Sequence, residues 1–394
     1  MKHFFRVLLF IAIAALCSGC GSQNGPGSAA GGQGGGGQKD GGKTGQNVRT
    51  AETTWQYVDT AMGTVIQQTL YAPDEETARD FSLQAMELLW GLERERLSWR
   101  LDTSEVYRAN ATSGSGEGFL LSRDLAELLE SGMELSERSQ GAFDMTLGSV
   151  TRLWNIDEWA AESNPEGFQI PSRETLAQAL SACGYEKLRL EWEERDEGER
   201  EEGRGEEEQE ENEREKCRIF LPEGMQLDLG AVGKGLGMSE LTSLLEGQSS
   251  ITGAVISLGG SILTYGSKPD GSSWRVGITD PFDKSSNIGI LSLEGQWCIS
   301  TSGDYERYVE VDGVRYHHIL DPRTGAPAVS QVRGVTVLLK DGLLSDGLST
   351  ACFILGPQEG MALAAEYGAE SLFILSNGEI VMSEGMERLF SETR

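Results

Sequence analysis

The stretch YERYVEVDGVRYHHILDPRTG, residues 305–325, contains the clearest fold signal of the chain. Its Asp312-Gly313 pair separates two short runs rich in Val and Tyr, and a type I′ turn requires positive φ at both central residues. The stretch therefore predicts a β-hairpin, and Asn377-Gly378 predicts a second hairpin by the same argument. Antiparallel strand pairing is expected in this half of the chain.

Helical and strand patterns alternate outside this stretch. Apolar residues recur at helical spacing over 75–97 and 124–139, and Ser172 is placed to cap a third helix that ends before Gly184. Further helices are expected over 345–356 and 357–368, and strands over 185–190, 217–221, 254–258, 274–278, 288–293 and 335–339. The mixture, which has no internal repeat, predicts an α+β fold with antiparallel sheets rather than a doubly wound parallel sheet.

The first residues have the pattern of a targeting segment. Lys2 and Arg6 precede an apolar run over 7–16 that is too short to span a bilayer and suits a signal peptide. The small residues before Cys20 resemble a bacterial lipobox, which would make Cys20 the lipidated residue; the alternative is ordinary secretion with incidental cysteines. We therefore predict a signal peptide over 1–19, a Gly/Ser-rich tether over 20–50, and one folded domain over 51–394.

Net charge is −29, which makes nucleic acid an unsuitable partner. Much of the negative charge lies in one block over 191–216, which follows one expected strand and precedes another. A block of this composition predicts a solvated loop inserted between the two strands, and the alternative is a docking segment for a basic partner.

The cysteines do not form a metal or redox motif. Beyond Cys17 and Cys20 the chain has four more, at 183, 217, 298 and 352, and none forms a C-x-x-C pair. Cys298 and Cys352 stand in apolar runs, and we expect both to be buried thiols.

A glycine-rich segment, DLGAVGKGLG over 228–237, precedes an expected helix that runs to about Leu245. Free amides at a helix start favour anions, and Lys234 adds a positive charge, so the segment predicts a phosphate site. The spacing matches neither G-x-G-x-x-G nor a Walker loop. The alternative is a helix start rich in glycine for close packing.

A second group of polar residues is expected on one helical face. Asp346, Ser349 and Thr350 are three and four residues apart, which aligns them along a helix. A carboxylate, a hydroxyl and a main-chain oxygen suit a hard cation such as Mg²⁺. The alternative is that Asp346 caps its own helix and Thr350 lies on a polar face of it.

Eight ordered motifs resemble those of the ApbE family of FAD:protein FMN transferases, and they cover the chain from about residue 55 to its end. They are AMGT (61–64), GAFD (141–144), DLGAVGKGLG (228–237), ISLGGSI (256–262), WRVGITDP (274–281), STSGDYERY (300–308), YHHILDPRTGAP (316–327) and SDGLSTACFILG (345–356). The resemblance implies an ApbE-like α+β fold, related to the T-fold, and Mg²⁺-dependent transfer of FMN from FAD to a Thr or Ser hydroxyl of an acceptor protein, with release of AMP.

The resemblance also implies which residues form the site. The residues expected to contact FAD are Met62, Ala142, Phe143, Asp144, Asp228, Lys234, Ser302 and Ile319. The residues expected to hold Mg²⁺ are Ala231 through its carbonyl, Asp346, Ser349 through its carbonyl, and Thr350.

Histidine chemistry is confined to two residues, because the third histidine, His3, lies in the targeting segment. In the implied reaction Lys234 and Mg²⁺ neutralise charge on the pyrophosphate, and His318 takes the proton of the acceptor hydroxyl. Asp321 is expected to position His318 or to serve in its place. The alternative is that His318 only contacts the cofactor; His317, on the opposite strand face, is expected to be structural.

Two other functions remain open at the level of the sequence. One is an FAD pyrophosphatase that yields FMN and AMP, and the other is a non-catalytic FAD-binding lipoprotein. For a transferase, the family implies acceptors among subunits of NQR-type or RNF-type complexes and extracellular flavoproteins. The protein is then expected on the extracytoplasmic face of the cell membrane, held by its lipid anchor.

Overall fold

The computed structural model of the chain describes residues 53–161, 167–193 and 216–393. The predicted signal peptide, Cys20 and the tether therefore lie outside the described residues. In chain order the helices and strands are β1 (Thr53–Ala61), β2 (Thr64–Ala72), α1 (Glu75–Gly91), η1 (Leu92–Leu97), α2 (Glu105–Ala111), β3 (Phe119–Leu121), α3 (Arg123–Arg138), α4 (Gly148–Trp154), α5 (Ile156–Ala161), α6 (Arg173–Ala182), η2 (Tyr185–Lys187), β4 (Arg189–Trp192), β5 (Cys217–Phe220), α8 (Gly233–Glu246), β6 (Gly253–Leu258), β7 (Ser261–Gly266), β8 (Trp274–Asp280), β9 (Asp283–Leu293), β10 (Trp297–Gly303), β11 (Tyr308–Val311), β12 (Val314–His317), β13 (Leu320–Asp321), β14 (Ala326–Pro327), β15 (Val332–Leu339), α9 (Gly342–Leu355), α10 (Pro357–Glu366), β16 (Glu370–Leu375), β17 (Ile380–Met382), α11 (Glu384–Leu389) and β18 (Phe390–Glu392).

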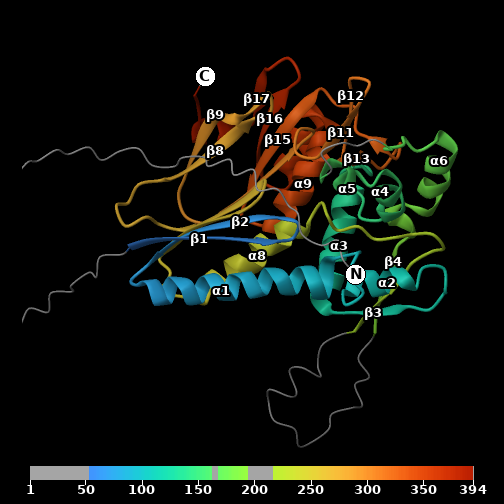
Figure 1. Cartoon of the computed structure of the whole chain (residues 1–394), viewed down its shortest axis with the longest axis horizontal. Helices are drawn as coiled ribbons and strands as arrows, with labels where there is room; N and C mark the ends of the chain where they lie inside the picture. The colour runs from blue at the N-terminus through green and yellow to red at the C-terminus, as the bar shows by residue number, and fades with distance from the viewer. Residues whose placement is uncertain (1–52, 162–166, 194–215, 394) are drawn as a thin grey trace, which may run out of the picture.

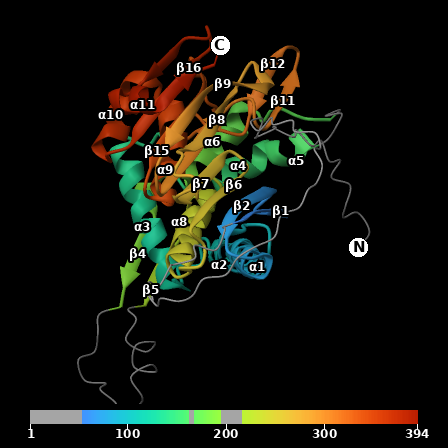
Figure 2. The same ribbon diagram turned by 90° about the vertical axis from the view of Figure 1, so that its left-hand side faces the viewer.

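The centre of the molecule is an eight-stranded sheet in the order β1-β2-β6-β7-β10-β15-β16-β17. Every neighbouring pair in it is antiparallel, which confirms the predicted α+β class. Figure 1 shows α1 running beneath β1 and β2, and in Figure 2 α8 lies between α1 and α9 and contacts both.

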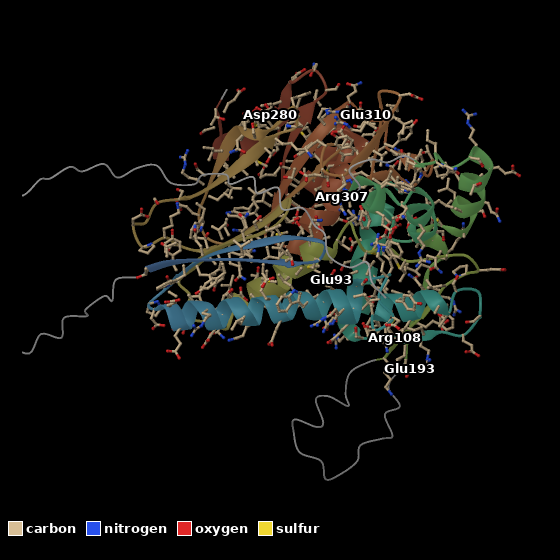
Figure 3. The ribbon with its side chains drawn as sticks, viewed as in Figure 1. Glu93, Arg108, Glu193, Asp280, Arg307 and Glu310 are labelled. Carbon is tan, nitrogen blue, oxygen red and sulfur yellow. The ribbon has the colours of Figure 1, made fainter. Side chains whose placement is uncertain are left out.

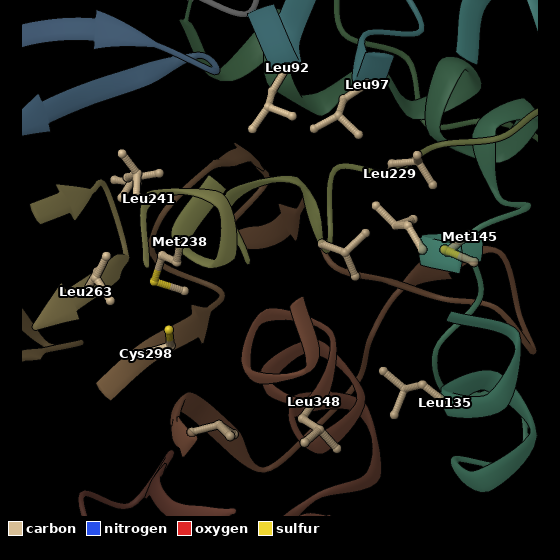
Figure 4. Close-up of a cluster of buried hydrophobic side chains, with 14 of the residues drawn as sticks. Leu92, Leu97, Leu135, Met145, Leu229, Met238, Leu241, Leu263, Cys298 and Leu348 are labelled. Atoms are coloured by element: carbon tan, nitrogen blue, oxygen red, sulfur yellow. The ribbon is translucent and has the colours of Figure 1, made fainter. Parts of the chain in front are cut away.

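The two faces of the sheet pack against different layers, because side chains alternate along each strand. On β10, Cys298 joins the large core formed with α1, α3, α8 and α9, whereas Ile299 joins a second cluster with β8 and β9. Figure 4 shows Met238 of α8, Leu348 of α9 and Cys298 converging in the large core. The prediction that Cys298 and Cys352 are buried thiols is confirmed, since both are fully buried and unpaired.

The segment over 185–190 was expected to be a strand, and this expectation is only half right. Residues 185–187 form the 3₁₀ turn η2, and β4 begins at Arg189. The reason is that the Tyr185 amide donates to Asp144 Oδ2 at 3.1 Å, while Gly184 adopts φ 127°. These two constraints turn the chain before it can pair as a strand.

Both predicted hairpins form, but with different turns. Asp312 and Gly313 have φ of 50° and 76°, as a type I′ turn between β11 and β12 requires. Between β16 and β17 only Gly378 has positive φ, at 85°, because the loop is longer and the Gly378 amide bonds back to the Leu375 carbonyl.

The strands on either side of the acidic block pair with each other, and the first residues of the block, Glu191 and Trp192, belong to β4 rather than to the expected loop. β4 and β5 run antiparallel with Trp192 opposite Cys217, so the residues over 194–215, which lie outside the described residues, join neighbouring strands. Within the described ranges, no helix is both long and apolar enough to cross a membrane.

Candidate functional site

A cavity of about 820 Å³ opens where the start of α8, the middle of α9 and the segments after β10 and β12 meet. This volume lies in the range of small-molecule and cofactor sites. The predicted site residues that line it are Met62, Ala142, Phe143, Asp144, Asp228, Ala231, Lys234, Ser302, His318, Ile319, Asp346 and Thr350. Asp321 and Ser349 are not among the lining residues.

Helices α8 and α9 approach closely at one wall of the cavity because two glycines face each other there. A Cβ on Gly235 would collide with the Gly342 carbonyl oxygen and lie 2.7 Å from the Cβ of Asp346. Close helix packing, the alternative considered for the glycine-rich segment, thus explains Gly235. Gly230 and Gly233 of the same segment line the cavity.

Asp346 is the buried carboxylate at this helix contact, with 4% of its surface exposed. Its Oδ2 accepts a bond from the Gly235 amide at 2.9 Å and lies 3.4 Å from Lys234 Nζ, and its Oδ1 lies 3.4 Å from Ser261 Oγ. Asp346 does not cap its own helix, because Asp341 accepts the bond from the Leu344 amide at the start of α9. It instead stabilises the N-terminus of α8.

The segment that leads into α8 is held by its own aspartate. Asp228 Oδ1 accepts a bond from the Gly230 amide at 2.9 Å, and its amide donates to the Met145 carbonyl at 2.8 Å. This local turn is typical of Asp and fixes the glycine-rich stretch against the GAFD segment. Lys234 follows in the first turn of α8, so its cation and the helix start face the same cavity.

Three hydroxyl groups link the end of β10 to α9. Ser349 Oγ donates to the Asp346 carbonyl at 2.8 Å, so Ser302 Oγ donates to Ser349 Oγ at 2.7 Å. Thr350 Oγ1 lies 3.5 Å from Ser302 Oγ. Ser349 is fully buried and away from the cavity, whereas Ser302 and Thr350 line it.

Oxygen donors near Asp346 fit a magnesium ion in chemical type. Within the described ranges no three His, Cys, Asp or Glu side chains gather as a metal site. The predicted set contains a single carboxylate with a hydroxyl and a main-chain oxygen, and Mg²⁺ commonly binds through one or two carboxylates together with waters and substrate phosphates. Asp346, Thr350 and the Ala231 residue all line the same cavity.

His318 is half-buried and enters the cavity wall directly after β12. Its Nδ1 lies 3.2 Å from the Arg307 carbonyl oxygen, which can only accept, so Nδ1 carries the proton and Nε2 is the acceptor. Enclosure by protein atoms, aided by the positive charge of Arg307, lowers the pKa of His318 well below its usual range. The ring is therefore neutral near pH 7 and able to take a proton.

The neighbours of His318 have other partners. His317 is 5% exposed, its Nε2 bonds to the Ala328 carbonyl at 3.0 Å, and its ring packs edge-on against Phe353, which confirms the structural role expected of it. Asp321 pairs with Arg323 at 2.8 Å and accepts that residue's amide. The hydrogen bond of the His318 ring is thus made to the Arg307 carbonyl rather than to Asp321, and a role of Asp321 in the reaction stays a prediction.

The GAFD segment forms a second wall of the cavity. Ala142 and Phe143 are buried, and Asp144 Oδ1 accepts bonds from the amide and hydroxyl of Thr146, both at 2.7 Å. Asp144 Oδ2 accepts from the Tyr185 amide. Burial raises the pKa of Asp144. Because both of its oxygens accept bonds from protein donors, this carboxylate shapes the wall.

Met62 occupies a strained turn at the rim. Its φ is 53°, a left-handed conformation that costs a residue such as Met about 1–3 kcal/mol. Its amide donates to Glu93 Oε2 at 2.8 Å, and Glu93 also lines the cavity. Figure 3 labels Glu93 just above the long helix α1. Glu93 lies in η1, a π-helical end to the helix expected over 75–97. Pattern analysis missed Glu93 because its helix face carries no motif.

Several charged residues of the wall were also missed. Arg100 lies over the ring of Trp99 at 3.9 Å from its centroid, and the Arg307 guanidinium bonds to Asp157 at 2.8 Å. All four residues line the cavity, and they come from segments that are far apart in the chain. Arg307 stands in a motif that assigns it no role, and the other three stand in no motif, so only the fold shows that they belong together.

The fold and the cavity define an enzyme-like α+β protein whose site joins a helix N-terminus, a lysine and a set of oxygen donors. The family model of the ApbE family matches residues 62–373. The chain belongs to the ApbE family.

Relatives of known name agree with this assignment. An FAD:protein FMN transferase of Treponema pallidum is 31% identical over 340 residues, covering 83% of this chain and 86% of that protein. One from Klebsiella pneumoniae is 30% identical over 340 residues, covering 86% and 94%. Among solved structures, the ApbE protein from Thermotoga maritima has a TM-score of 0.70 at 27% identity, covering 86% of this chain and 100% of that one. The apo flavinyl transferase ApbE of Pseudomonas stutzeri has a TM-score of 0.68 at 28% identity, covering 87% and 98%.

Proposed function

We propose that this chain is an FAD:protein FMN transferase that moves FMN from FAD to a Thr or Ser hydroxyl of an acceptor protein and releases AMP. The relatives that carry this name match most of the chain. The observation that carries the proposal is that Lys234, Asp346 and His318 line one cavity although they come from α8, α9 and the segment after β12. One cavity thus joins groups suited to a phosphate, to a cation and to a hydroxyl proton.

Mg²⁺ is proposed to bind Asp346, Thr350 and the Ala231 carbonyl. When bound, it would withdraw charge from the pyrophosphate oxygens and make the phosphorus easier to attack. Ser349 supports this group through its hydroxyl bonds to Asp346 and Ser302. A carbonyl contribution from Ser349 stays a prediction.

The residues of the chain perform the remaining steps. Lys234 lies at the N-terminus of α8, where its charge and the helix amides favour an anionic phosphate. His318 Nε2 accepts the proton of the acceptor hydroxyl as the oxygen forms a bond to the FMN phosphorus. The bond from that phosphorus to the bridging oxygen breaks, and the oxygen leaves with AMP.

Bound FAD should make His318 a stronger base. In the free protein the pKa of His318 is lowered by its enclosure and by Arg307. Negative charge on a nearby pyrophosphate favours the protonated ring and therefore raises the pKa. A base of higher pKa removes a hydroxyl proton more readily, so substrate binding and base strength are coupled.

We further propose that the protein acts outside the cytoplasmic membrane, anchored by a lipid on Cys20. Support comes from the charged, apolar and small-residue order of the first twenty residues. The acceptor is then an extracytoplasmic protein segment, with subunits of NQR-type or RNF-type complexes as the first candidates.

The test is to incubate the full-length protein with FAD, Mg²⁺ and a candidate acceptor, and to follow the intact mass of the acceptor. A gain of one FMN phosphoryl group that disappears with EDTA supports both the transfer and the metal. Free FMN with unmodified acceptor, across a panel of acceptors, would contradict transfer and indicate a pyrophosphatase. Tight FAD binding without any AMP would indicate storage.

A further inference from the structure

The main-chain carbonyl oxygen of Arg307 holds the ring of His318, the proposed general base. The Arg307 carbonyl receives the His318 amide at 3.1 Å and His318 Nδ1 at 3.2 Å. Arg307 precedes β11 and His318 follows β12, so the two residues lie opposite each other at the open end of that hairpin. Any movement of the Arg307 backbone would move the imidazole with it.

The side chain of Arg307 is anchored to a different part of the chain. Its Nη1 donates to Asp157 Oδ1 at 2.8 Å, and Asp157 Oδ2 lies 3.8 Å from Arg100 Nη2. Asp157 belongs to α5, and all three residues line the cavity. The pair thus joins α5 to the hairpin that carries His318.

This ion pair is poorly suited to a role in stability. The side chains of Arg307 and Asp157 are 48% and 34% exposed, and exposed pairs of this kind contribute little to folding. Asp157 is also unsuited to contact the pyrophosphate of FAD, because a carboxylate repels it. A carboxylate at this position is better explained by its hydrogen bond to Arg307, whose side chain it holds in place.

We propose that Asp157 is a positioning residue of the transfer reaction. By holding the Arg307 guanidinium against α5, it fixes the Arg307 carbonyl, which keeps the proton of His318 on Nδ1 and leaves Nε2 to accept the hydroxyl proton. The inference rests on the proposed function, since it requires His318 to act as the base.

The first experiment compares Asp157→Ala, Asp157→Glu and Glu193→Gln in the full-length protein, measured by AMP release with acceptor present. Glu193 is the matched control, because it forms an exposed pair with Arg218 at 2.9 Å on another sheet, distant from Arg307 in Figure 3. Misplacing a catalytic group by a fraction of an ångström lowers kcat about 10-fold while KM for FAD stays nearly constant. We expect that loss in Asp157→Ala, partial rescue in Asp157→Glu, and unchanged kcat in the control. Unchanged kcat in Asp157→Ala would overturn the proposal.

A double variant separates positioning from the proposed function itself. If Asp157 acts through His318, then Asp157→Ala should cost nothing further in a His318→Ala background. An equal loss in both backgrounds would overturn the positioning role and leave the transferase intact. Full activity of His318→Ala alone would instead remove His318 from the proposed mechanism.

The tautomer of His318 gives a readout that does not depend on activity. In ¹⁵N spectra of the full-length protein the two ring nitrogens distinguish the Nδ1–H from the Nε2–H form, and the signals can be assigned by loss in His317 and His318 variants, because the chain has only 3 histidines. We expect the Nδ1–H form in the unaltered protein and a mixture in Asp157→Ala. A single unchanged Nδ1–H form in that variant would contradict the proposal.

Discussion

The α8–α9 contact and the α5–hairpin contact form two sides of the same cavity, and they are built in opposite ways. At the first, Gly235 and Gly342 bring two helix backbones together around a buried Asp346. At the second, the exposed side chains of Asp157 and Arg307 join elements from distant parts of the chain. Changes at the first contact should therefore disturb folding and binding together, whereas changes at the second should affect chemistry alone.

The largest effect on activity is expected at the α5–hairpin contact, the second of these two sides. His318→Ala should lower the transfer rate about 10²- to 10⁴-fold, which is the usual contribution of a general base. The melting temperature and the affinity for FAD should stay unchanged, because the half-buried His318 ring is hydrogen-bonded to a main-chain carbonyl at the edge of the cavity. Single-turnover AMP release, FAD titration by fluorescence and thermal unfolding measure the three quantities.

Loss of FAD binding in His318→Ala would contradict this division. It would show that the ring holds the cofactor, which is the alternative considered for this residue from the sequence.

A smaller loss of turnover is expected from a change at the α8–α9 contact. Asp346→Asn keeps an oxygen that can accept the Gly235 amide but removes the charge beside Lys234. Turnover should fall about 100-fold, as when one electrostatic group of a site is removed, and the dependence on Mg²⁺ should weaken. Turnover measured against Mg²⁺ concentration checks this. An unaltered Mg²⁺ dependence would contradict the metal assignment.

Gly235→Ala should disrupt the close packing of α8 against α9. The new methyl group would collide with the Gly342 carbonyl, and overpacking of a backbone contact lowers the free energy of unfolding by about 3 kcal/mol. Urea unfolding measures this loss. The matched control is Gly233→Ala, whose Cβ would lie 3.7 Å from Leu97 and Met62 and should leave stability nearly unchanged. Equal stability of the two variants would show that the helices are not held in this close contact.

The smallest expected effect is on the pH dependence of folding stability, and it arises from His317, a buried histidine of the β11–β12 hairpin. Burial lowers the pKa of His317 from 6.5 to about 4, and its Nδ1 has no hydrogen-bond partner to receive a charge. Between these values the unfolded chain binds the proton and the folded chain does not, so stability falls as pH decreases. Each pKa unit is worth about 1.4 kcal/mol, which gives a loss of about 2 kcal/mol between pH 6.5 and pH 5.

Chemical unfolding across this pH range tests the prediction. His318 contributes with the same sign, because its pKa is also lowered. The share of His317 is therefore the difference between the unaltered protein and His317→Gln. A pH slope that is identical in both proteins would exclude His317 as its source.

The contrast between the two sides also explains how much the sequence could predict. Lys234 and Asp346 stand in contiguous motifs on regular helices, so pattern and resemblance could predict both, and both line the cavity. No motif marks Asp157 or Glu93 as a site residue, because their partners are distant in the chain. The hydrogen-bond partner of the His318 ring is a main-chain carbonyl, which any residue could supply, so the sequence pointed to the side chain of Asp321 instead.

The most direct test of the account counts both products of one turnover. The full-length protein is loaded with one equivalent of FAD and mixed with Mg²⁺ and excess acceptor, and samples are quenched over time for AMP, free FMN and acceptor-bound FMN. We predict that AMP and acceptor-bound FMN appear together in equal amounts, without free FMN, and that both are lost in His318→Ala. AMP accompanied by free FMN, or AMP formation at full rate in that variant, would contradict it.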